Sequence, residues 1–557
     1  MEKALSSPRR IERVVKKPAF IPTLLFSTLV ATLIISLSVS AKPPRIDRIV
    51  PEIGLPGGVL VVEGENFGSE RGRSSVAIGS VRPTSSSYLE WTDSRISVQI
   101  PEEATSGLVR VTGSRATSNG VLFTNRRLIP IVLEERAAPG YPLIESVVPA
   151  KGSVGSLVTI TGLNFGLSRG DGAVLFTGLP TGEEGVAVGL FTPASVSDYD
   201  YESWTEQTVR VRIPDGASSG TVRIVTDRGE SNSHFFEVVR SGGTKSLGGR
   251  RGFQIEQSIE IDRVGASEGS VIALWVPGPT ATFEQRNVES VHVPEPQRNE
   301  DSGIVWYSIS AFELEATYRL ESTYWLERYS VDTRIDPAYV QSAYDTQRKL
   351  YRHYTGEDAF VPAEDEGIAL AAESAAGKQT NPYLAARNIF YFLLTRLSYD
   401  RKPSEKGVLG AFIAAKGSAQ DYALLYCAML RSRGIPARPV TGVLVYDNRR
   451  TVRHVWAEFY LEGYGWVPVD PVLADGVRFG DFPEIDNPEA YYFGNIDEQR
   501  ITFARGIVGV PIDADLLDRG ETRLIATVPS LQSIHEYATS GVEYRSRWNP
   551  IEIVYFW

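Results

Sequence analysis

The chain has 557 residues, with 50 glycines and 33 prolines but only two methionines and one cysteine, and its formal net charge is −11. This length exceeds what one hydrophobic core supports and predicts about three to four domains, and the aromatic, turn-rich composition favours β domains over a helical bundle. The acidic balance argues against nucleic acid as a partner, because phosphate neutralisation needs clustered lysine and arginine, and a lone cysteine excludes an internal disulfide.

The first 41 residues have the order of an export signal. Residues 1–17 carry six basic side chains against two glutamates, and an apolar run occupies 18–41. Basic before apolar predicts export with the N-terminus held inside. The run is long enough to span a hydrocarbon core of ~30 Å, and Val39-Ser40-Ala41 also suits a signal peptidase, so a retained membrane anchor and a cleaved signal peptide are both open. Without residues 1–17, whose net charge is +4, the chain carries −11 − 4 = −15.

Two copies of one pattern follow, in residues 44–135 and 142–240. Block 45–68 matches 143–166 at an offset of 98, and block 91–112 matches 204–225 at an offset of 113. Each copy has short alternating strands and a Gly-x-Asn-Phe-Gly corner whose residues tolerate positive φ. Each is therefore predicted to be a small β-sandwich. The difference of 113 − 98 = 15 places an insertion in the second copy, in about 177–203.

This repeated pattern resembles the IPT/TIG family of immunoglobulin-like domains. The resemblance implies two all-β immunoglobulin-like sandwiches that act as spacers or receptor modules, and the acidic charge disfavours the DNA contact made by some members. We expect the pair to form a stalk that holds the next domain away from a membrane. A dedicated ligand site is the less favoured reading, and its best candidate is the insertion with Tyr199, Tyr201 and Trp204.

The next segments change character along the chain. Residues 241–252 are glycine-rich and basic, which predicts a flexible linker. Residues 253–336 alternate as strands and resemble the β region that precedes the core of bacterial transglutaminase-like proteins. From about 337 the apolar period becomes helical, with Asn381 as an N-cap before Pro382. Residues 501–557 predict a C-terminal β extension.

The candidate chemistry lies in two blocks, 416–442 and 453–471. Ser418 and Asp421 fit a capping box at the start of a helix running to about Arg433. On the following strands, alternation places His454 with Trp456 on one face, and Trp466 with Asp470 on one face.

These blocks resemble the transglutaminase-like superfamily, whose fold is α+β and papain-like, here over residues 337–500. The family pattern is Lys-Gly-x-Cys-x-Asp-Tyr-Ala, then His-x-Trp-x-Glu, then Gly-Trp-x-Pro-x-Asp-Pro. The resemblance implies that His454 takes the general-base position and that Asp470 orients it. It also implies cleft-lining positions at Gly417, Tyr422, Trp456 and Trp466.

One position departs from the family pattern, because Ala419 stands where active members have the cysteine nucleophile. A methyl group forms no thioacyl intermediate, so the family route to transamidation or proteolysis is closed. Cys427 lies eight residues along the same helix, ~12 Å away, and Ser418 is better explained as the N-cap. A His–Asp pair could still act as a general base on water. Five scattered histidines and no close ligand cluster predict neither a metal nor a cofactor.

The leading hypothesis is an exported, non-catalytic binding or scaffold protein of the cell envelope. It would be periplasmic or surface-exposed, anchored through residues 18–41 or released, and would hold a protein or glycan ligand. The alternative is an enzyme that acts on peptide amide bonds of envelope proteins or peptidoglycan through another nucleophile. A third reading is a purely structural envelope component whose cleft is vestigial.

Overall fold

The computed structural model describes residues 42–557 except 114–115, 129–139, 182–190, 300–302, 311, 313–315, 448 and 511–517. The basic segment 1–17 and the apolar run 18–41, with the signal peptide or anchor expected of them, lie outside the described residues. Within the described part, no helix combines the length and apolarity that crossing a membrane requires.

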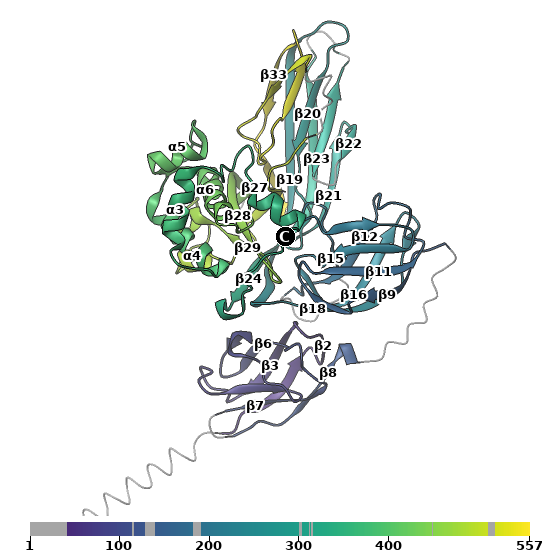
Figure 1. The fold of residues 1–557 in the computed structure, drawn as a ribbon, viewed down its shortest axis with the longest axis vertical. Coiled ribbons are helices and arrows are strands. Elements are labelled where there is room, and N and C mark those ends of the chain that lie inside the picture. The colour runs from purple at the N-terminus through teal and green to yellow at the C-terminus, as the bar shows by residue number, and fades with distance from the viewer. Residues whose placement is uncertain are drawn as a thin grey trace, which may run out of the picture.

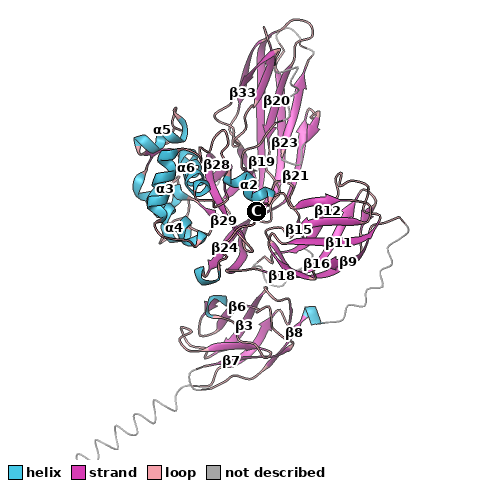
Figure 2. Cartoon of the chain, viewed as in Figure 1, coloured by secondary structure: helices cyan, strands magenta, loops and turns pink. Residues whose placement is uncertain are grey.

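The predicted fold class is confirmed. Figure 1 shows two β-sandwiches, a long β domain that projects upward in this view, and a mixed domain whose helices gather on its left side. Figure 2 shows the same division, with nearly all α-helix in the mixed domain and strands elsewhere. The chain is therefore a multidomain, β-rich protein with one α+β part.

The first repeat is a sandwich of two four-stranded sheets. One sheet has the order β1 (Arg45–Val50), β3 (Val59–Glu65), β6 (Arg95–Gln99) and β5 (Tyr88–Trp91). The other has the order β2 (Ile53–Gly54), β8 (Val121–Asn125), β7 (Gly107–Thr112) and β4 (Ser75–Ile78). Alternate side chains of both sheets meet in a closed core that includes the corner residue Phe67.

The second repeat has the same plan with two more strands. One sheet has the order β14 (Tyr201–Trp204), β15 (Thr208–Arg212), β11 (Leu157–Leu163) and β9 (Leu143–Val148). The other has the order β10 (Lys151–Ser153), β18 (His234–Val239), β16 (Ala217–Thr226), β12 (Ala173–Gly178) and β13 (Phe191–Pro193), with β17 (Gly229–Glu230) on β16. The corner prediction holds in both copies, since Asn66 and Asn164 have φ of 64° and 62°. Strand β13 comes from the insertion.

The segment expected as a flexible linker, 241–252, is instead the first half of strand β19 (Gly243–Gly265). Strand β19 pairs along its length with β24 (Tyr318–Ile335), with a bulge between Leu247 and Arg250. The glycines serve this geometry: a Cβ on Gly248 would collide with Ser330, and one on Gly252 with the ring of Trp557. Their small size permits close packing here, so glycine content does not signal flexibility.

Strands β19 and β24 carry the long β domain. One sheet has the order β21 (Gln285–Val293), β24, β19 and β33 (Glu543–Trp548), with β34 (Glu552–Phe556) also on β19. The second has the order β22 (Arg298–Asn299), β23 (Ile304–Ile309), β20 (Ile272–Pro277), β32 (Glu536–Thr539) and β31 (Gly520–Arg523). The segment 501–557, expected as a C-terminal β extension, mostly completes the two sheets begun by 253–336.

The mixed domain packs helices against one four-stranded sheet. The sheet has the order β29 (Gly465–Val469), β28 (Arg450–Leu461), β27 (Ala437–Tyr446) and β30 (Arg500–Arg505), and a short pair joins β25 (Ser398–Tyr399) to β26 (Lys416–Gly417). The helices are α2 (Lys349–Thr355), α3 (Glu366–Ala376), α4 (Pro382–Arg396), α5 (Gly407–Ala414), α6 (Ala419–Ser432), α7 (Pro471–Ala474) and α8 (Pro488–Tyr491).

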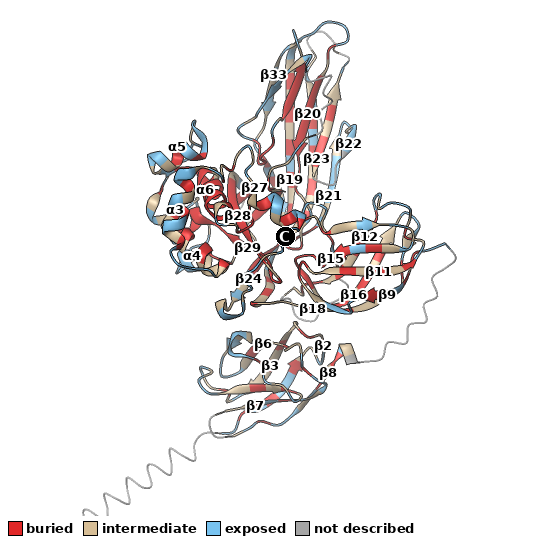
Figure 3. Ribbon diagram, in the orientation of Figure 1, coloured by how far each residue is buried: buried red, intermediate tan, exposed pale blue. Residues whose placement is uncertain are grey.

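Helix α6 is the centre of this domain. The predicted cap forms at α4, where the Asn381 side chain accepts from the Leu384 amide, and α6 begins with the predicted capping box. Every residue of α6 from Asp421 to Arg431 is buried, and Figure 3 shows this helix and the sheet strands as the buried interior of the domain. The rigid surroundings fix whatever side chain stands at the start of α6.

Candidate functional site

Ala419 is the first residue of α6, and Ser418 before it is fully used as a cap. The Ser418 amide donates to Asp421 Oδ2 at 2.8 Å, and the Ser418 hydroxyl donates to the same oxygen at 2.9 Å. The same carboxylate accepts from the Ser404 amide at 3.0 Å. A hydroxyl held by an anionic acceptor and buried in this way is not placed to attack a substrate.

Cys427 does not replace the missing nucleophile either. Its side chain is fully buried in the core between α6 and the sheet. Burial raises the pKa of the Cys427 thiol to about 12, so the reactive thiolate is absent at neutral pH.

The structure brings His454 and Asp470 together. His454 Nε2 lies 2.7 Å from Asp470 Oδ2, and both side chains are completely buried. Asp470 follows β29 and caps α7 with its other oxygen, which accepts from the Leu473 amide at 3.1 Å. His454 Nδ1 is buried and has no hydrogen-bond partner among the described residues. One ring nitrogen is thus held and the other left free.

Arg500 on β30 is a third member of this cluster that sequence reasoning missed. Its Nη1 donates to Asp470 Oδ2 at 2.9 Å, and its guanidinium also pairs with Asp497 and lies 5.1 Å from the centre of the Trp456 ring. Burial raises the pKa of Asp470, but His454 and Arg500 outweigh it and lower that pKa to about 2. No motif surrounds Arg500, and only the pairing of β30 with β27 brings it here.

The shared carboxylate limits what the His–Asp pair can do. Asp470 Oδ2 serves both His454 and Arg500, so its negative charge is partly neutralised by the arginine. A carboxylate compensated in this way supports a developing imidazolium less strongly than a free one. The geometry therefore weakens the case for His454 as a general base on water.

The start of α6 lies close to this cluster. Gln420 Oε1 accepts from Arg453 at 2.5 Å, which joins the residue after Ala419 to the residue before His454. On the other side, Tyr399 pairs with Gly417 and its ring lies 6.2 Å from Phe479, whose ring is 5.9 Å from His454. The segments that carry Ala419 and His454 are thus joined through neighbouring residues.

Two known protein families have models that match parts of this chain. A model of the transglutaminase-like superfamily matches residues 369–471, and a model of the IPT/TIG domain matches residues 44–125 and 142–238. The chain carries a transglutaminase-like core and two IPT/TIG domains. The sequence-based recognition of both families is confirmed.

Individual relatives share smaller parts. An uncharacterized protein of Haemophilus influenzae is 26% identical over 164 residues, which cover 23% of this chain and 43% of that protein. A cyclomaltodextrin glucanotransferase of Niallia circulans is 32% identical over 90 residues, which cover 16% of this chain and 12% of the enzyme. The chain therefore spans less than half the length of these curated relatives. Among solved structures, a cysteine-protease candidate from Cytophaga hutchinsonii is 15% identical with a TM-score of 0.36, covering 55% of this chain and 92% of that one.

The positions expected to line an open cleft of the transglutaminase-like core are covered. Trp456 and Trp466 are 1% and 2% exposed, and Tyr422 is fully buried with its hydroxyl donating to Asp475 at 2.8 Å. At Gly417 a side chain would not fit, since a Cβ there would lie 2.6 Å from the Cβ of Asp421. The expectation of a cleft lined by the two tryptophans is corrected: both rings pack inside domain contacts.

No site for a metal emerges from the residues described. Within 42–557, outside the gaps given above, no group of three or more His, Cys, Asp or Glu side chains could hold an ion. The expectation that the protein uses no metal or cofactor stays a prediction.

Proposed function

We propose that the protein is an exported, non-catalytic scaffold or binding protein of the cell envelope. The observation that carries this proposal is the methyl group of Ala419 at the start of α6, in a domain that also holds a buried His454–Asp470 pair, with Ser418 held as a cap and Cys427 buried. Without a nucleophile, the transglutaminase-like core has no covalent route to acyl transfer.

Several features support the scaffold reading. The sheet of the core is buried on both faces, by α6 on one side and by other domains on the other. The order of basic segment and apolar run supports export, with residues 18–41 as anchor or cleaved signal. We infer that the partner is a protein or glycan of the envelope, held by surfaces of the assembled domains.

A direct experiment tests the absence of catalysis. The full chain is incubated with a fluorescent primary amine and a glutamine-containing acceptor protein, and separately with labelled peptides to detect hydrolysis. We expect no product above buffer, and no difference between wild type and His454→Ala. Product formation that disappears in His454→Ala would show an active enzyme working through another nucleophile and would overturn the proposal.

A further inference from the structure

The insertion that distinguishes the second IPT/TIG domain has two parts. One part makes contacts within the domain, and the other contacts the transglutaminase-like core. The Tyr201 hydroxyl accepts a hydrogen bond from the Val174 amide at 3.0 Å, as the Tyr88 hydroxyl does from the Val76 amide at 2.8 Å in the first domain. Trp204 repeats Trp91 in the same way, donating to the carbonyl of the corner phenylalanine. Tyr201 and Trp204, expected as ligand-site candidates, therefore belong to the common framework.

The preceding loop, Ser195–Asp200, contacts the transglutaminase-like core. Asp198 accepts a hydrogen bond from Arg438 on β27, and the Tyr199 ring lies 5.2 Å from the His353 ring on α2. The Ser197 carbonyl accepts from the Tyr354 hydroxyl at 3.3 Å. Each residue from 197 to 199 thus has a partner in the core.

The loop is shaped by its own bonds before it meets the core. Asp200 accepts from the Ser195 amide at 2.8 Å and returns a bond from its own amide to the Ser195 carbonyl at 3.0 Å. Between them Tyr199 adopts a positive φ of 56°, an unfavourable conformation for a residue with a side chain. A braced loop loses little conformational entropy when it docks.

Arg438 makes the loop an ionic anchor. Its side chain is fully buried, its Nε donates to Glu458 at 2.9 Å, and its guanidinium lies 3.8 Å from the centre of the Trp466 ring. Asp198 supplies the second carboxylate. Taking Asp198 away leaves a buried guanidinium with one partner fewer, which is costly inside a protein.

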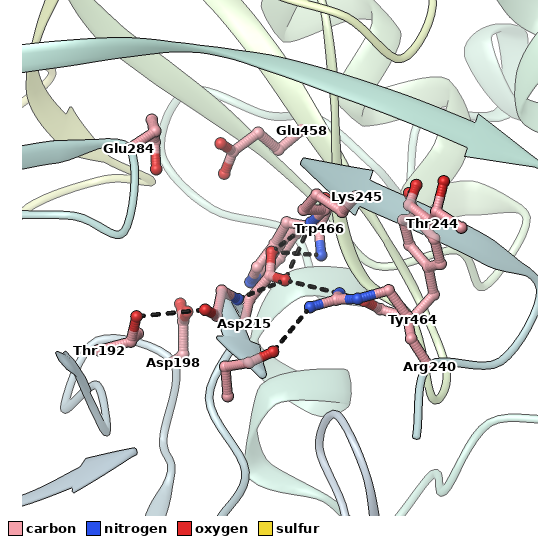
Figure 4. Close-up of polar contacts among 12 residues, drawn as sticks. Thr192, Asp198, Asp215, Arg240, Thr244, Lys245, Glu284, Glu458, Tyr464 and Trp466 are labelled. Atoms are coloured by element: carbon pink, nitrogen blue, oxygen red, sulfur yellow. Dashed lines mark hydrogen bonds and ion pairs between the residues drawn. The ribbon is translucent and has the colours of Figure 1, made fainter. Parts of the chain in front are cut away.

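A second anchor of the same domain is shown in Figure 4. Asp215, in the turn between β15 and β16, accepts from Lys245 at 2.7 Å, from Arg240 at 3.1 Å and from the Trp466 amide at 3.0 Å. Burial raises the pKa of Asp215, but the two cations outweigh it and hold that pKa below its usual value. Arg438 of the first anchor contacts the ring of Trp466, and Asp215 of the second accepts from its backbone amide.

These contacts cover the sheet face that carries His454. Along β28, Trp456 packs with Leu179 of the second IPT/TIG domain and with Phe283. Two residues on, Glu458 meets Arg438 beneath the loop. At Tyr460, the domain approaches so closely that a Cβ on Gly155 would collide with the Tyr460 hydroxyl. From Trp456 to Tyr460 the face is closed by another part of the same chain.

We propose that the Ser195–Asp200 loop is a latch that holds the second IPT/TIG domain over this face of the transglutaminase-like core. The latch keeps the face of Trp456 and Glu458 closed, and its release exposes that face to solvent. The first domain, which lacks the insertion, has the shorter segment between β4 and β5 in place of the latch. This proposal is independent of the lack of catalysis, because its test reads exposure and not activity.

Hydrogen exchange on the full chain tests the latch. We expect the double variant Asp198→Asn with Tyr199→Ala to speed amide exchange in β28 and β29 by at least about tenfold, since it removes a charge-assisted bond and a ring contact. Glu202→Gln is the matched control, because Glu202 pairs with Arg212 inside the same domain. The control is expected to change those amides less than about twofold.

Amides of α6 report whether the core itself has loosened. The latch requires that α6 exchange stays at the wild-type rate while β28 and β29 speed up. Unchanged exchange in β28 and β29, or equal acceleration in both variants, would overturn the proposal. If the double variant does not fold, Tyr199→Ala alone, at a half-buried ring, gives the same readout with the same outcomes.

Discussion

The two IPT/TIG domains share one fold but are attached to the rest of the molecule in different ways. The first is held by partly exposed contacts: Arg334 of β24 donates to the carbonyls of Tyr88 and Leu89, and Arg127 pairs with Glu237 of the second domain. The second is held by buried ions at Arg438 and Asp215. The difference shows that docking depends on a few residues, Asp198 in the insertion and Asp215 at the end of a strand, and not on the sandwich as a whole.

The two domains also differ in the surroundings of one equivalent carboxyl group. Glu102 and Asp215 follow the same Ile-Pro step at the end of equivalent strands. Burial raises the pKa of Glu102 to about 7, and one of its oxygens has no hydrogen-bond partner among the described residues. In the second domain Lys245 and Arg240 instead lower the pKa of Asp215 below its usual value. Burial disfavours the charged form of a carboxyl group, and a cation from a neighbouring segment compensates for this cost.

The largest expected effect comes from removing the cation at the second domain. Lys245→Met leaves Asp215 buried with Arg240 alone and is expected to lower the free energy of unfolding by about 3–5 kcal/mol. Urea unfolding followed by intrinsic fluorescence measures the loss. Lys151→Met, at an exposed lysine of the same domain, is the control and should be near neutral. Adding Asp215→Asn to Lys245→Met should restore part of the stability, and a further loss would contradict the pairing argument.

Sequence reasoning reached the elements whose causes are local. The corner at Asn66 and Asn164, the capping box at Ser418 and the helix start at Asn381 all follow from nearby residues, and the structure has them. His454 and Asp470 came from spacing along strands and from family resemblance, and they meet in space.

What sequence reasoning missed depends on contacts between distant segments. The glycines of 241–252 predict flexibility locally, yet they allow close packing against Ser330 and Trp557. Trp466 was expected in a cleft because the resemblance to the transglutaminase-like superfamily implies a cleft-lining residue there, but Arg438 and Asp215 enclose it. Charged partners 200 or more residues apart leave no signal in a single sequence.

The first domain offers the next test, through pH. Because the folded pKa of Glu102 is about 7, above its ordinary 4.5, the folded state holds the proton more tightly. Stability is therefore fully present below pH 4.5 and lost as pH rises through 7, by up to about 3 kcal/mol. We expect Glu102→Gln to be more stable than wild type at pH 8 and equal to it near pH 4. Glu103→Gln, its exposed neighbour, should leave the pH profile unchanged, and an identical profile for both variants would refute the assignment.

A third buried carboxylate, in the transglutaminase-like core, extends the comparison to smaller effects. His454 and Arg500 lower the pKa of Asp470 to about 2 from 3.8, so its contribution is present above pH 3.8 and lost as pH falls through 2. That contribution is about 2 kcal/mol. Asp470→Asn should cost about this much at pH 7 and flatten the acid limb of the stability curve. Asp486→Asn, at an exposed site, should retain the wild-type acid limb.

The smallest effect is expected where the first domain meets the long β domain. Arg334→Ala removes two bonds to the carbonyls of Tyr88 and Leu89 in a half-exposed contact, where each bond exchanges with water. The expected loss is below about 1 kcal/mol, and the midpoint of urea unfolding should move little. A loss as large as that of Lys245→Met would mean that both domains are docked by buried interactions. The contrast between them would then lie in the insertion alone, because only the second domain has the Asp198 contact with Arg438.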